Sequence, residues 1–144
     1  MKSFTGNFTQ QEGIPDSAIN KAIEVMRSGR LHRYNVDIGE KAEATQLELE
    51  FAQYQGSTFC LACASGGYAM QLALASIGLE HNEPVLTNAF TLSPVPGAIH
   101  NVGAKPVLVE TTDQLVIDLD DLDKKIRSSD ARVFLLSHMR GHIV

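Results

Sequence analysis

STFCLACASGGYAMQLALASIG, at residues 57–78, is the stretch that decides the fold. The apolar run at residues 57–64 predicts a short buried strand. Ser65, Gly66 and Gly67 then predict a tight turn, and residues 68–77 carry the apolar spacing of a helix that Gly78 ends. A strand, a glycine turn and a helix in this order predict the first unit of an α/β domain.

The chain that follows continues to alternate strands with helices. Strands are predicted at residues 84–88, 105–109 and 132–137, and helices at residues 93–102 and 118–128. The complete order from residue 57 is β-α-β-α-β-α-β, which indicates a parallel sheet with right-handed crossovers. A four-stranded sheet that stopped here would leave a long edge exposed, so we expect the sheet to be incomplete.

The chain before this domain predicts an N-terminal arm and two helices, at residues 1–56. Residues 1–13 are polar, and Ile14-Pro15-Asp16-Ser17 is typical of a helix start. The first helix should end at Ser28-Gly29, and residues 29–39 show no period and predict a loop. A second helix is expected from about Glu40 to Gln55, with one apolar face formed by Ala44, Leu47, Phe51 and Tyr54.

Charge and composition exclude several classes of partner. The net charge is −5 and the twelve Lys and Arg are scattered, whereas a protein that binds duplex nucleic acid normally has a basic face. No apolar run approaches the roughly 20 residues that cross a bilayer, so no membrane is expected. The polar N-terminus has no signal-peptide core, which predicts a cytoplasmic protein.

The Ser65-Gly66-Gly67 turn is the first candidate site. A helix N-terminus at the carboxyl end of a strand offers unpaired N–H groups and a partial positive charge to an anion, and glycines let a phosphate approach closely. Neither GxGxxG nor GxxxxGK[ST] occurs, so this is neither a dinucleotide fingerprint nor a P-loop. From spacing alone, a tight turn without a ligand is the favoured interpretation.

Metal and general-base sites are weaker candidates. Cys60 and Cys63 with His138 and His142 suggest a zinc set, but 74 residues separate the two pairs, and side chains three apart on a strand diverge. Buried, inert cysteines and structural histidines are therefore favoured, and no metal is expected. The acidic run lacks the glycine and terminal glutamate of a calcium loop, so helix capping explains it; it comprises Asp113, Asp118, Asp120, Asp121 and Asp123.

Four stretches, in order, resemble one family. They are residues 47–56 (LELEFAQYQG), 65–78 (SGGYAMQLALASIG), 85–109 (VLTNAFTLSPVPGAIHNVGAKPVLV) and 137–142 (SHMRGH). They resemble the DegT/DnrJ/StrS family of pyridoxal-phosphate-dependent sugar aminotransferases, whose pattern includes S-G-T-x-A-L, P-x-F/Y-T-F/W and H-x-x-G. The resemblance covers roughly residues 15–144. It implies part of the large domain of the aspartate aminotransferase type, with an incomplete cofactor-binding domain at residues 57–144.

The resemblance also implies a cofactor, pyridoxal phosphate (PLP), and its contacts. The phosphate-binding S-G-T falls on Ser65, Gly66 and Gly67, so a hydroxyl is replaced by glycine. The aromatic residue that stacks on the pyridine ring falls on Leu92, which lacks a π-system. The Asp that pairs with the pyridine nitrogen and the Schiff-base Lys come after the H-x-x-G strand in this family, and this chain ends before both. No catalytic residue is therefore assigned.

Three hypotheses follow. In the first, the chain is an N-terminal fragment of an aminotransferase, and the fragment itself is inactive. The parent enzyme is expected to move an amino group from an amino-acid donor to a keto sugar that is linked to a nucleotide. In the second, it is a shortened, non-catalytic binding or dimerisation module of the same fold, since family members are homodimers. In the third, it is a small α/β module that binds a phosphate ligand.

Overall fold

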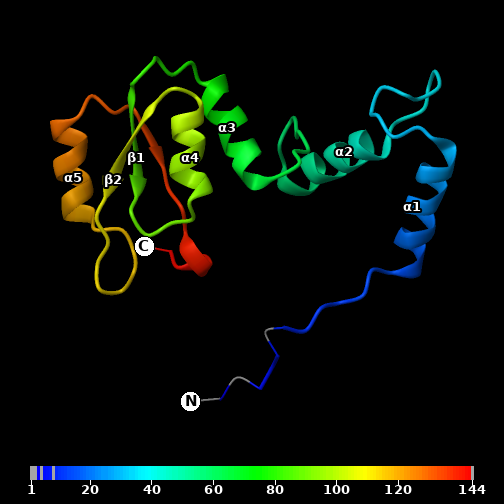
Figure 1. Cartoon of the computed structure of the whole chain (residues 1–144), viewed down its shortest axis with the longest axis horizontal. Coiled ribbons are helices and arrows are strands. Elements are labelled where there is room, and N and C mark those ends of the chain that lie inside the picture. The colour runs from blue at the N-terminus through cyan, green and yellow to red at the C-terminus, as the bar shows by residue number, and fades with distance from the viewer. Residues whose placement is uncertain (1–2, 4, 8, 144) are drawn as a thin grey trace. The chain divides into compact units, whose positions relative to one another are not determined.

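The computed structural model describes residues 3, 5–7 and 9–143 and divides into two compact units. Unit 1 is Met1–Ala62 and unit 2 is Cys63–Val144. Figure 1 shows the helices of unit 1 in blue to teal and the sheet of unit 2 in green to red.

Unit 1 contains helices α1 (Asp16–Ser28) and α2 (Glu43–Gln55). Gly29 and Gly56 end them in the left-handed conformation, with φ of 69° and 68°, which glycine adopts without a steric penalty. Both predicted helices are confirmed. The second begins at Glu43 rather than Glu40, because the Glu40 carboxylate binds Arg30 and Ala42 is extended.

The helices of unit 1 bury little apolar surface. Among the described residues of this unit only Ala52 is buried. The predicted apolar face of α2 is uncovered, since Leu47, Phe51 and Tyr54 are 55%, 47% and 82% exposed. Packing within unit 1 therefore contributes little hydrophobic stabilisation to these helices.

Unit 2 is built on a parallel sheet with the strand order β2-β1-β3. Its elements are α3 (Gly66–Ser76), β1 (Pro84–Asn88), α4 (Pro94–Asn101), β2 (Lys105–Val109), α5 (Leu119–Ser128), β3 (Val133–Leu135) and the short 3-10 turn η1 (Met139–Gly141). Leu86 of β1 aligns with Val107 on one side and with Phe134 on the other. The parallel sheet and the α/β class are as predicted.

Helices cover both faces of this sheet (Figure 1). Val85 packs in one cluster with Leu74 of α3 and with Ala98 and Ile99 of α4. Leu86, the next residue, packs on the other face with Val109, and Leu122 of α5 joins that cluster. This alternation of side chains gives β1 the two buried faces that its continuous apolar run predicts.

The predicted first strand is wrong. Residues 57–64 form no strand, and most of them are exposed, with Phe59 at 88%. Their ordered contact is instead the Ala62 amide, which donates to the Glu48 carboxylate (2.8 Å), itself paired with Arg33. An apolar run becomes a strand only where a neighbouring strand accepts its backbone hydrogen bonds, and no described strand pairs with this one. The sheet has three strands among the described residues, and β3 is shorter than predicted.

Candidate functional site

The N-terminus of α3 is formed by the predicted glycine turn. Ser65 is extended and is the N-cap, and its Oγ accepts a hydrogen bond from the Tyr68 amide (3.2 Å). The amides of Gly66 and Gly67 have no acceptor among the described residues. A Cβ at Gly66 would meet no atom within 4 Å, so the backbone there is open to an incoming group. Two unpaired amides at a helix N-terminus suit an anion.

The glycine turn lies beside the carboxyl end of β1. A Cβ at Gly67 would lie 3.4 Å from Cβ of Pro94, the first residue of α4, which follows β1 after a short loop. Figure 1 shows α3 and α4 side by side, both starting at the end of the sheet where β1 ends. Packing of α3 against α4 therefore places the turn at this edge of the sheet, although residues 57–64 before it form no strand.

The loop between β1 and α4 carries the other predicted contact. Leu92 is 61% exposed, so its side chain is available to pack on a flat ligand. Thr91 Oγ1 is buried without a hydrogen-bond partner, which is an unusual state for a hydroxyl. Asn88 at the end of β1 is 4% exposed and binds the backbone of both Phe90 and Ser137.

These groups fit the phosphate end of PLP better than its reactive end. The Gly66 and Gly67 amides provide donors, and the open space beside Gly66 admits a phosphate. The lysines of unit 2 lie elsewhere. Lys105 begins β2 at the opposite edge, Lys124 is exposed on α5, and the Lys125 ammonium is held by Leu108 O (2.5 Å) and Asp121 (2.7 Å).

The other sequence candidates do not form a metal site within the described residues. Cys60 and Cys63 are half-buried rather than buried, and because they lie on irregular chain, the argument that a strand separates them no longer applies. His138 and His142 are exposed. Within the described part of the chain, no three His, Cys, Asp or Glu residues are arranged to hold a metal ion.

The acidic run is explained by helix capping and ion pairing, as predicted. The Asp118 carboxylate accepts from the amides of Asp120 (2.9 Å) and Asp121 (3.1 Å) at the start of α5. One turn later, Asp121 pairs with Lys125 and Asp123 with Arg127. The Glu110 amide and the Lys125 ammonium lower the pKa of Asp121, the amide contributing more.

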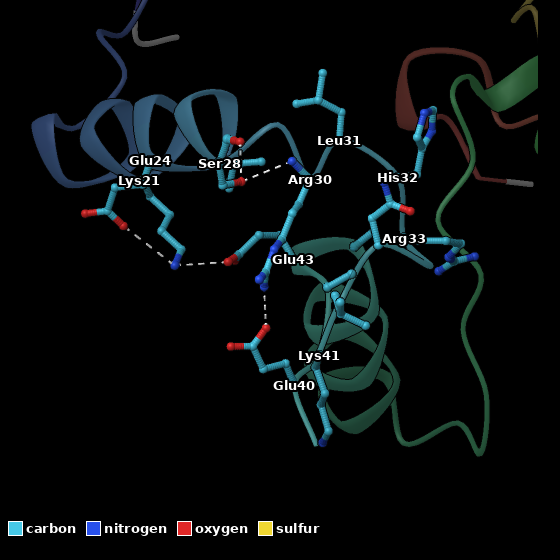
Figure 2. Close-up of a pocket in the computed structure, with 15 residues that line it drawn as sticks. Lys21, Glu24, Ser28, Arg30, Leu31, His32, Arg33, Glu40, Lys41 and Glu43 are labelled. Carbon is cyan, nitrogen blue, oxygen red and sulfur yellow. Dashed lines mark hydrogen bonds and ion pairs between the residues drawn. The ribbon is translucent and has the colours of Figure 1, made fainter. Parts of the chain in front are cut away.

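A cavity of about 470 Å³ lies within unit 1, apart from the predicted site residues. Figure 2 shows its wall, where the α1, loop and α2 side chains form ion pairs. Arg30 binds Asp37 (2.6 Å) and Glu40 (2.8 Å), and Lys21 binds Glu43 (3.0 Å). The Asp37 hydrogen bond is the main reason that the pKa of Arg30 is raised. Sequence reasoning missed this cavity because residues 29–39 show no period. The available signal was the charge of Arg30, opposite to those of Asp37 and Glu40.

Membrane insertion finds no support in the helices. Of the helices in the described residues, none combines the length and the apolar character that crossing a bilayer requires.

The fold defines the class of this chain as α/β, with the architecture of part of an aminotransferase domain. A putative sugar aminotransferase from Streptococcus pneumoniae, Spr1654 in its PLP form, superimposes with a TM-score of 0.77 at 22% identity, over 92% of this chain and 32% of that one. The chain belongs to the DegT/DnrJ/EryC1/StrS aminotransferase family, whose model matches residues 14–144. The resemblance seen in the sequence is thereby confirmed.

Curated relatives agree with this assignment. A dTDP-3-amino-3,4,6-trideoxy-alpha-D-glucose transaminase of Micromonospora megalomicea subsp. nigra is 30% identical over 107 residues, which is 74% of this chain and 28% of the relative. A protein of Geobacillus stearothermophilus named pleiotropic regulatory protein is 31% identical over 111 residues, 77% of this chain and 28% of that protein. This chain therefore spans less than a third of the length of these relatives.

Proposed function

We propose that this chain is the N-terminal, phosphate-binding part of a PLP-dependent aminotransferase that acts on a keto sugar, and that it is inactive by itself. The observation that supports the proposal best is the pair of unpaired amides, Gly66 and Gly67, beside the carboxyl end of β1. Helix N-termini at this edge of an α/β sheet are suited to bind phosphate groups.

Each residue of the site has a proposed part in holding the cofactor. Gly66 and Gly67 bind the phosphate, and Leu92 packs on one face of the ring. PLP, when bound, supplies an electron sink for the carbanion chemistry of amino-group transfer. Transfer also needs an amine that condenses with the aldehyde and an acid that keeps the ring protonated. The positions of Lys105, Lys124 and Lys125 support the absence of such an amine among the described lysines of unit 2.

The finer assignments follow from the family. The name of the Micromonospora relative, a transaminase of a dTDP-linked amino sugar, supports a nucleotide-linked sugar as the substrate. The keto form of that sugar and an amino acid as nitrogen donor are proposed from the family resemblance. We further propose a homodimer, as the family resemblance implies, and a cytoplasmic location, as the polar N-terminus predicts.

Borohydride reduction in the presence of PLP tests the proposal. A Schiff base at one functional lysine would be reduced to a stable, covalent adduct on that residue. We expect only scattered, substoichiometric labelling of surface lysines, together with weak binding of pyridoxamine phosphate that inorganic phosphate competes away. Stoichiometric labelling of one lysine would contradict inactivity, and binding of neither phosphate compound would contradict the cofactor site.

The second candidate is a non-catalytic binding or dimerisation module of the same fold. The relative named as a pleiotropic regulatory protein favours it, since that name carries no transferase activity. Light scattering of the purified chain distinguishes this candidate: a discrete dimer that binds no pyridoxamine phosphate supports it, and a monomer counts against it.

A further inference from the structure

The side chain of Asn88 joins the carboxyl ends of two strands. Its Nδ2 donates to Phe90 O (2.7 Å) and Ser137 O (3.1 Å), and its Oδ1 accepts from the Ser137 amide (2.9 Å). Asn88 is the last residue of β1, whereas Ser137 lies two residues after β3 and 49 residues later in the chain. These bonds therefore extend the pairing of β1 with β3 beyond the last aligned residues, Thr87 and Leu135.

Only a primary amide of this length satisfies the arrangement. The Phe90 and Ser137 carbonyls each require a donor, and the Ser137 amide requires an acceptor. The two N–H groups and the oxygen of one asparagine side chain meet these requirements in a single orientation. Aspartate offers no donor when ionised, and glutamine is longer by one methylene. Because Asn88 is 4% exposed, water cannot easily replace these bonds. The family pattern P-x-F/Y-T-F/W places proline at this position, and proline makes no such bonds.

The two segments that Asn88 joins are the loop that carries Leu92 of the candidate site and the chain that follows β3. Leu92 follows Asn88 by four residues, in the loop that ends at Pro94 beside Gly67. His138 follows Ser137 directly and begins the turn η1. Strand pairing does not hold either position, since β1 ends at Asn88 and β3 at Leu135. Contacts other than the sheet must set their mutual position.

We propose that Asn88 is a positioning residue that sets Leu92 and His138 relative to each other, and thereby the ring-binding side of the cofactor site. The link to the cofactor rests on the proposed function. The positioning itself concerns only the two segments and is measurable without any ligand.

The experiment compares Asn88→Asp with a matched control, Thr87→Val, in the whole chain. Asp keeps the size of the side chain but loses both donors. Thr87 is the neighbouring residue, equally buried, and its Oγ1 has no partner, so valine removes no hydrogen bond. Backbone amide resonances, amide exchange, and the affinities for pyridoxamine phosphate and inorganic phosphate are measured for each variant.

We expect Asn88→Asp to shift the amide resonances of Leu92 and His138 and to weaken pyridoxamine phosphate at least about fivefold, with inorganic phosphate changed less than about twofold. Thr87→Val should change neither affinity. A loss of stability alone would lower both affinities together. Unmoved resonances at Leu92 and His138, or equal loss of both ligands, overturns the proposal.

Two further outcomes are also decisive. If Asn88→Asp does not fold, amide hydrogen exchange in the unaltered chain tests the proposal instead. The Ser137 amide donates to Asn88, whereas the His138 amide has no acceptor among the described residues, so the Ser137 amide must exchange more slowly. Equal exchange rates overturn the proposal. If the unaltered chain binds neither ligand, the proposed function fails, and the resonances still test whether Asn88 positions the two segments.

Discussion

Gly67 lies against Pro94 so closely that a Cβ on the glycine would be 3.4 Å from Cβ of the proline. This separation is an ordinary van der Waals contact, so a Cβ at this position does not displace α4. The position is also where the family pattern has threonine. Gly67 is therefore the position at which this chain lacks the hydroxyl donor of the family pattern, and a Cβ can be added there.

Gly67→Thr is expected to tighten the binding of inorganic phosphate by about two- to tenfold, because it adds one hydroxyl donor beside the two amides. Isothermal titration calorimetry measures the change. Gly67→Val is the matched control, with the same shape and no hydroxyl. Equal tightening by valine would show that backbone rigidity, and not the donor, is responsible.

Arg132 and Glu83 join the starts of β3 and β1 and give a pH prediction. Arg132 Nε donates to Glu83 Oε1 (2.5 Å), and this bond, followed by the Glu80 amide, lowers the pKa of Glu83. A carboxylate with a lowered folded-state pKa stabilises the fold above its unfolded pKa, and this contribution is lost as the pH falls through the folded value. Glu83→Gln should therefore lower the Tm at pH 7 and lower it by less near pH 3, which lies below the ordinary glutamate pKa of about 4.3.

Circular dichroism melts at both pH values measure this effect. Glu110→Gln is the control, since the Glu110 side chain is exposed and makes no ion pair within the described residues. A Tm difference between Glu83→Gln and the unaltered chain that persists unchanged at the lower pH would contradict the prediction.

Asp118 gives a prediction about helix capping. Because its carboxylate accepts from two amides at the start of α5, Asp118→Ala should lower the free energy of unfolding by about 1 kcal/mol. Asp118→Asn keeps an acceptor oxygen and should cost less. Urea unfolding of unit 2 measures both, and Asp120→Ala, in the same exposed turn, is the control. An equal loss for the asparagine variant would rule out the capping explanation.

Local signals predicted most elements of this fold, and long-range contacts account for the errors. The bounds of β1 and β2 agree with the sequence, in which Glu83 and Pro84 mark the start of β1, and Gly103 and Glu110 flank β2. Residues 57–64 carry an equally apolar run but lack a strand to pair with, and no local pattern reveals whether a partner exists. The same reasoning explains why β3 is shorter than predicted, since among the described strands it pairs only with β1, over three aligned residues.

The candidate site was predictable only in part. Ser65, Gly66 and Gly67 have a local signature, a capping serine followed by glycines, and the structure places them at a helix start. The side-chain hydrogen bonds between Asn88 and Ser137 have no local signature, because the two residues are 49 positions apart in the sequence. The ion pairs around Arg30 follow no helical or strand period, so periodicity analysis passes over them.

The near absence of buried side chains in unit 1 has a consequence for the order in which the molecule becomes structured. Helices of 13 residues, such as α1 and α2, are marginal in water when tertiary contacts do not support them. A newly made polypeptide would therefore have its first half emerge as fluctuating helix, vulnerable to proteases, whereas the clusters around Val85 and Leu86 give unit 2 a buried core. Brief trypsin treatment should accordingly cut at Arg27, Lys41 and their neighbours while residues 84–135 stay intact.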